Sequence, residues 1–233
     1  MIKNIRNLFT LEYLPFTLLL AVNLGFLSLA FIIDPPEAIF SGFFHIIQSR
    51  SILITDYIEL GGIGAAFLNV SMVGISALLM VLRLGVKPAG ANIMALWMSI
   101  GFAFFGKNLF NMIPLTVGVL LFAKYRKQPF SQYYLSALLV ATISPTISEI
   151  AFLGMFSRPV EITAGVIMGF LVGFIFPAIS ADSVKIHGGF NLYNMGFAGG
   201  LVATMLATVF KNILNKGTEM FRWEKALIIK TNC

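Results

Sequence analysis

Charged side chains are scarce in this chain. Only 11% of its 233 residues are Asp, Glu, Lys or Arg, whereas 58% are hydrophobic and the mean hydropathy is +0.89. A water-soluble domain of this length needs far more polar surface to cover its core. The composition therefore predicts an all-α, polytopic membrane protein.

Cysteine and histidine are nearly absent as well. The one cysteine, Cys233, cannot form an intrachain disulfide or a thiolate metal site alone. Two histidines, His45 and His187, cannot build a typical zinc site unaided. The sequence contains neither a His-Glu-x-x-His motif nor a Gly-Lys-Ser/Thr phosphate loop. We therefore expect no metal, no cofactor and no enzymatic activity.

Seven stretches have the apolar character of membrane helices. They cover residues 13–33, 61–82, 88–106, 108–123, 130–156, 159–181 and 188–210. The fourth is short and contains Pro114, so we expect a half-helix or broken helix there. The apolar patch 38–47 is too short to cross and is expected to lie at the interface or to dip in. We expect one transmembrane domain over 1–210 and a basic polar tail over 211–233.

The net charge of +6 lies in short runs between the apolar stretches, which is typical of positive-inside topology and not of a nucleic-acid partner. An N-terminus on the cytoplasmic side of the inner membrane, with every stretch crossing, places most cations inside: Lys3, Arg6, Arg83, Lys87, Lys124, Arg126, Lys127 and Lys185. Seven crossings leave the basic tail outside. Either the last stretch re-enters without crossing, or the tail is not a natural ending.

One pentapeptide occurs twice in near-identical form. The copies are Asn108-Leu109-Phe110-Asn111-Met112 and Asn191-Leu192-Tyr193-Asn194-Met195. Under the topology above they start on opposite sides of the membrane, which is the mark of an inverted repeat, although chance accounts for part of the match.

Each copy places two amides on one helix face. Amides are costly in hydrocarbon, so two such pairs, with Asn69 beside them, are predicted to line a path for a small polar solute. The alternative is that these amides hydrogen-bond to neighbouring helices.

Three further features carry hypotheses. Glu149 follows Pro145 in an apolar stretch, and it is either an ion-coupling acid or an interfacial residue. Lys107 either draws anions to an outer mouth or snorkels to the interface. Gly165, Gly169 and Gly173 form a small-residue face that we assign to helix packing.

Several blocks resemble a bacterial membrane-protein family known only as a domain of unknown function, over residues of about 31–210. The blocks are Leu53 to Tyr57, Gly61 to Asn69, Phe105 to Asn108 and Ala123 to Lys127. The resemblance implies longer members, of which this chain is the N-terminal part. A fainter similarity to urea transporters involves Gly61 to Asn69, Gly189-Phe190-Asn191 and, more loosely, Phe110-Asn111. Their Asn-Pro is here Asn69-Val70, so we take from it only re-entrant, amide-bearing helices.

The expected function is therefore that of a transporter or channel-like protein for a small polar solute. The alternative is a membrane scaffold that packs through its glycine faces. The expected partners are the lipid bilayer, the solute, and a second copy or a missing C-terminal half.

Overall fold

A computed structural model describes residues 10–52, 54–188 and 194–214, and within these ranges the chain is helical with no strand. The long elements are α2 (Leu14–Ile33), α5 (Ile63–Arg83), α7 (Leu109–Tyr125), α10 (Arg158–His187) and α11 (Asn194–Leu214). Shorter α-helices are α3 (Pro36–Gln48), α4 (Tyr57–Gly61), α6 (Gly90–Phe102), α8 (Tyr134–Val140) and α9 (Pro145–Ala151). The 3-10 turns in the described ranges are η2 (Leu11–Tyr13), η3 (Phe130–Gln132) and η4 (Ala141–Ile143). The all-α prediction is confirmed for this part of the chain.

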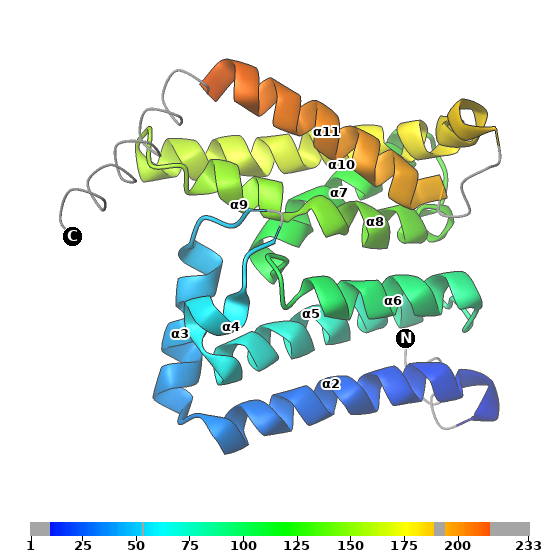
Figure 1. The fold of residues 1–233 in the computed structure, drawn as a ribbon. Helices are drawn as coiled ribbons and strands as arrows, with labels where there is room; N and C mark the ends of the chain where they lie inside the picture. Colours follow the sequence, from blue (N-terminus) through cyan, green and yellow to red (C-terminus); the bar gives the residue numbers. More distant parts are fainter. Residues whose placement is uncertain (1–9, 53, 189–193, 215–233) are drawn as a thin grey trace.

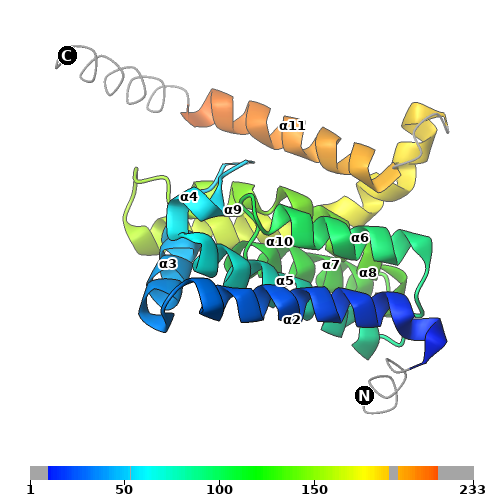
Figure 2. The same ribbon diagram turned by 60° about the horizontal axis from the view of Figure 1, so that its bottom comes forward.

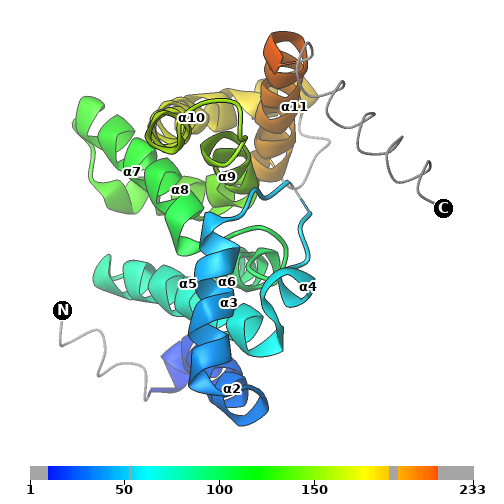
Figure 3. The same cartoon turned by 90° about the vertical axis from the view of Figure 1, so that its left-hand side faces the viewer.

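The helices form two groups that lie one above the other (Figures 1 and 3). The first contains α2 to α6 and the second α7 to α11. Separate apolar clusters lie within each group, and a third joins α2, α5 and α6 to α8. Helix α11 lies at the edge of the second group, against α10 (Figure 2). The interior of the molecule therefore includes a seam between two helical groups.

Helix α3 runs across the ends of α2 and α5 (Figure 1). Pro35 and Pro36 separate it from α2, because proline fixes the backbone and suits the first turn of a new helix. A Cβ on Gly42 of α3 would lie 2.0 Å from the main-chain oxygen of Gly61, so only glycine permits this approach. The apolar patch 38–47 is thus a separate helix lying across α2 and α5.

Three described helices are long and apolar enough to cross a bilayer: Leu11–Ile33, Ile63–Arg83 and Arg158–Ser183. A fourth crossing is obtained if Tyr134–Ile143 and Pro145–Ala151, which meet at 52°, are one broken span. Helices α6 and α7 are apolar but shorter. The described residues therefore give three to four clear spans where the sequence predicted seven.

The helix break falls in a different stretch from the one expected. Helix α7 is continuous through Pro114, although it is short. The interruption lies instead between α8 and α9, at η4 and Ser144. At the other end of the chain, α11 extends to Leu214, four residues beyond the predicted end of the transmembrane domain at 210, and 215–233 lie outside the described residues.

Candidate functional site

Two interruptions of the helical pattern meet at the seam between the groups. Helix α6 has 13 residues and α5, to which a short loop connects it, has 21. At about 1.5 Å per residue, α6 therefore stops about 12 Å before the far end of α5. The turn after α6 packs against the α8–α9 break, since α6 and α7 both contact η4. Irregular backbone is thus held inside the bundle.

Asn69 of α5 ties down the turn after α6. Its Nδ2 donates to the main-chain oxygens of Ala103, at 2.7 Å, and Lys107, at 2.9 Å. Oxygens at the end of a helix lack partners within the helix, so a side-chain donor satisfies them. The buried amide of Asn69 therefore closes the C-terminal end of α6.

Asn108 and Asn111 begin α7 with a reciprocal cap. The Asn108 Oδ1 accepts from the main-chain nitrogen of Asn111 at 3.0 Å, and the Asn111 Oδ1 accepts from that of Asn108 at 2.9 Å. Such a capping box satisfies two of the free N–H groups at a helix start. The remaining donors reach other elements, because Asn108 Nδ2 donates to the Tyr57 hydroxyl and Asn111 Nδ2 to the Ser148 hydroxyl. Both amides are wholly buried and bond to the chain itself.

The hydroxyl of Tyr57, on α4 of the first helical group, accepts the hydrogen bond from Asn108 Nδ2. Its ring is fully buried, and its hydroxyl lies 2.9 Å from Asn108 Nδ2 and 3.3 Å from Ser51 Oγ. Burial raises the pKa of the Tyr57 phenol above its ordinary value, because the phenolate loses hydration there. Tyr57 therefore keeps its proton and links the loop before α4 to the start of α7.

Gly106 allows the turn to fit against the α8–α9 break. Its φ of +103° is in the region that favours glycine. A Cβ at this position would lie 2.9 Å from Pro145 Cγ and 3.0 Å from the Ile52 main-chain oxygen. Any side chain here would push the two interruptions apart.

Lys107 is the unexpected residue of this turn. Its side chain is 0% exposed, although it was expected to draw anions at an outer mouth or to snorkel to the interface. The ammonium donates to the Ser99 hydroxyl of α6 at 3.1 Å. No carboxylate among the described residues forms an ion pair with it. An ammonium has three donors, so this one retains two.

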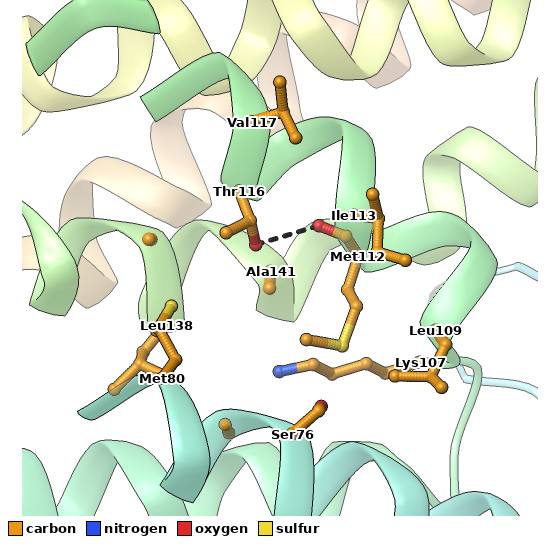
Figure 4. Close-up of a pocket in the computed structure, with 12 residues that line it drawn as sticks. Ser76, Met80, Lys107, Leu109, Met112, Ile113, Thr116, Val117, Leu138 and Ala141 are labelled. Carbon is orange, nitrogen blue, oxygen red and sulfur yellow. Dashed lines mark hydrogen bonds between the residues drawn. The ribbon is translucent and has the colours of Figure 1, made fainter. Parts of the chain in front are cut away.

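The Lys107 side chain enters a cavity of about 350 Å³ in the seam between the groups. Figure 4 shows it running beneath Met112, with its nitrogen pointing toward the space bordered by Met80 and Leu138. Of the lining residues only Lys107, Ser76 and Thr116 have polar side chains, and the remainder are apolar. The cavity is therefore an apolar chamber with one cationic group.

The second Asn motif lies mostly outside the described residues, Asn191 included. Asn194 begins α11, where its Nδ2 donates to the Ser180 main-chain oxygen at 2.9 Å and its Oδ1 accepts from the Ser183 hydroxyl. It is not among the residues that line the cavity, nor are Asn69, Asn108 and Asn111. The assignment of the asparagines to a solute path thus remains a prediction, while their described bonds join helices.

The helices that follow the two motifs run in opposite directions. Pro114 of α7 meets Gly169 of α10, and Leu115 meets Gly173, so α7 and α10 are parallel. Helix α11 starts beside the end of α10, through Asn194 and Ser183, and packs back along it. This relation is the one that an inverted repeat requires, and the repeat itself stays a prediction.

Gly165, Gly169 and Gly173 face α7 and α9 of the same chain. A Cβ on Gly173 would lie 2.1 Å from the Leu115 main-chain oxygen, and one on Gly165 would lie 2.9 Å from that of Ile147. These approaches are closer than any side chain permits. The glycine face is therefore covered within the chain.

Glu149 is on α9, where its Oε1 accepts from Arg50 at 2.9 Å. The two side chains are 30% and 42% exposed, respectively. The coupling role assigned to Glu149 is not tested by this geometry, which places the carboxylate in a partly exposed ion pair.

The described residues contain no group of three histidine, cysteine, aspartate or glutamate side chains that could hold a metal ion. Several buried polar residues escaped the sequence analysis, Ser99 and Asn23 among them. Ser99 gives no signal in sequence, whereas Asn23, an amide in the first apolar stretch, could have been singled out by the same argument as Asn69.

One protein-family model matches residues 35–212, and its description is "Protein of unknown function (DUF1576)". Comparison with curated proteins and with solved structures gives no match. The family match carries no information on urea transporters, so that similarity stays an expectation. Because the match covers most of the chain, the protein belongs to the DUF1576 family of proteins of unknown function.

Proposed function

We propose that this chain is a multi-pass membrane protein that moves a small polar solute, and that the solute binds beside Lys107. The observation that carries the proposal is a wholly buried ammonium that faces a cavity and lacks a paired carboxylate among the described residues. A buried, unpaired charge is unfavourable by on the order of several kcal/mol. Such residues are therefore retained in membrane proteins where they act on a solute.

The exposed surface supports a membrane location. Large apolar side chains face outward along α2, as Leu18, Leu24 and Ile32 do, and along α10, as Ile167 and Leu171 do. Exposed apolar surface on this scale is typical of contact with lipid or with another protein. Lipid accounts for it in helices long enough to span a bilayer.

The distribution of cations supports an inner-membrane protein with a cytoplasmic N-terminus. The loop after α5, the end of α7 and the end of α10 lie at one end of the molecule (Figure 1). These segments carry Arg83, Lys87, Lys124, Arg126, Lys127 and Lys185. Lys87 also pairs with Glu12 beside the start of α2, at 2.7 Å. The positive-inside rule makes this end cytoplasmic.

The broken helices supply the structural requirement for a solute site within a bundle. Backbone that leaves the helical pattern inside a membrane is tolerated where it is enclosed by protein or lines a cavity. In transporters, interrupted helices of this kind form the binding site near the middle of the membrane. Here Asn69, Asn108, Asn111 and Gly106 stabilise the interruption, and Lys107 faces the cavity.

The test is uptake by liposomes containing the purified protein. Labelled urea, glycerol, acetate and lactate serve as probes, and protein-free liposomes give the background. We expect uptake of at least one probe above background, and its loss in Lys107→Met. Lys124→Met is the matched control, because Lys124 is exposed at the end of α7. Background uptake of every probe, or uptake unchanged by Lys107→Met, would overturn the proposal.

A further inference from the structure

We propose that the ligand of the Lys107 cavity is a monocarboxylate with a short apolar chain, and that it enters from the side of the bundle between α5 and α7. This inference rests on the proposed function, since it names the solute class of the same site. It follows from the charge, the lining and the opening of the cavity.

The charge of the site selects an anionic head group. Among the described residues Lys107 Nζ has one partner, Ser99 Oγ, and its ammonium, which lines the cavity, has two further donors. The hydroxyl of Ser76 donates to the Val73 main-chain oxygen at 2.8 Å, and that of Thr116 donates to the Met112 main-chain oxygen at 3.0 Å. Both hydroxyl protons are therefore occupied. Lys107 is the one lining side chain with donors left for a ligand, which suits a single negative charge.

The lining selects an apolar body. Met80, Met112 and Leu138 surround the space that the ammonium enters (Figure 4). A compact, strongly hydrated anion would lose its water there and gain only one cationic partner. A carboxylate with an alkyl chain places its head on Lys107 and its chain against the methionine side chains, which adapt to varied apolar shapes. The volume of about 350 Å³ holds on the order of ten water-sized groups.

The cavity reaches the outer side of the bundle. Ile113, which lines it, is 52% exposed, and Ser76, Met80 and Thr116 are half-buried. These residues belong to α5 of the first group and α7 of the second. In a membrane this flank contacts acyl chains, where an alkyl carboxylate partitions with its chain in the hydrocarbon. The ligand can therefore enter from the bilayer.

The experiment measures binding, independently of transport. The full chain in lipid nanodiscs is dialysed to equilibrium against labelled hexanoate, and empty nanodiscs give the background. Unlabelled hexanol, acetate and hexylammonium compete in separate arms. We expect saturable hexanoate binding, with hexanol and acetate each at least tenfold weaker, and no competition from hexylammonium.

Three variants complete the test. Lys107→Met should weaken hexanoate binding by about tenfold or more, because a hydrogen bond to a charged donor is lost, and should leave hexanol binding intact or tighter. Ala77→Leu narrows the cavity and keeps the Lys107 ammonium, and it should weaken hexanoate more than acetate. Lys124→Met should bind as the unmodified chain does.

Equal competition by hexanol and hexanoate would overturn this inference, as would unchanged hexanoate binding in Lys107→Met or in Ala77→Leu. Its failure is distinct from that of the proposed function. If urea or glycerol uptake depends on Lys107 but hexanoate does not bind, the monocarboxylate assignment is wrong and the proposed transport function stands. Hexanoate binding without uptake of any probe, labelled hexanoate included, removes transport and leaves the site.

Discussion

The side-chain nitrogen of Asn69 lies 2.9 Å from the main-chain oxygen of Lys107. Through this bond a residue in the second turn of α5 fixes the backbone of the turn that carries the buried ammonium. The same nitrogen also bonds the Ala103 oxygen, at 2.7 Å. The position of Lys107 therefore depends on an amide from a different helix.

Replacing Asn69 tests this dependence. Asn69→Leu leaves two buried main-chain oxygens without their donor, so we expect a loss of about 1–3 kcal/mol in the free energy of unfolding. Asn69→Asp should lower the free energy of unfolding further, because a carboxylate oxygen would face the main-chain oxygens of Ala103 and Lys107. Thermal unfolding in detergent measures both variants. Ser28→Ala removes an exposed local bond and serves as the control. Unfolding of Asn69→Leu at the same temperature as the unmodified chain would show that the bonds do not matter.

The contact between α7 and α10 depends on the absence of a side chain at Gly173. Gly173→Ala places a Cβ 2.1 Å from the Leu115 oxygen, which must separate the two helices. We expect destabilisation of about 1–3 kcal/mol, as for other overpacked sites. Gly101→Ala is the matched control, because nothing lies within 4 Å of its Cβ. The control should be neutral or more stable by up to about 1 kcal/mol, since alanine favours helix. Similar unfolding temperatures for the two variants would contradict the close packing.

Tyr57 provides a pH-dependent test. Its pKa is raised in the folded chain, so the folded state retains the phenol proton at a pH where the unfolded state has released it. The stability that this residue contributes is complete below a pH of about 10 and is lost as the pH rises above it. Tyr57→Phe should therefore lose less stability than the unmodified chain between pH 9 and pH 11. Unfolding temperatures at the two pH values give the comparison, and parallel losses in both proteins would argue against a buried phenol.

The Arg50–Glu149 pair separates an ion pair from a coupling acid. Because both side chains are partly exposed, we expect Glu149→Gln and Arg50→Gln each to lower stability by less than about 1 kcal/mol. The double variant should be at least as stable as the less stable of the two single variants, as expected for two groups that interact mainly with each other. Uptake in liposomes should respond equally to either change. If Glu149→Gln alone abolished the dependence of uptake on a proton gradient, the carboxylate would be a coupling acid after all.

The apolar runs and prolines of the sequence correctly indicated where the helices of the bundle lie. All seven apolar stretches contain helix among the described residues, because a long uncharged run satisfies its backbone only by folding on itself. Pro35 and Pro36 end one helix and start the next for equally local reasons. The sequence predicted a half-helix or broken helix at Pro114. Helix α7 is short, but it continues through Pro114, which removes one main-chain donor without interrupting the helix.

The helical character of the chain and the approximate bounds of its helices followed from the sequence, since these depend on neighbours along the chain. The roles of the polar residues depend on the packing of the helices. Asn69, Asn108 and Asn111 donate to backbone or side chains up to 51 residues away, so their role depends on which helices meet. Lys107 is buried because the first helical group covers it from one side and the second from the other. No local pattern encodes that enclosure, because burial is a property of the packed pair and of neither segment alone.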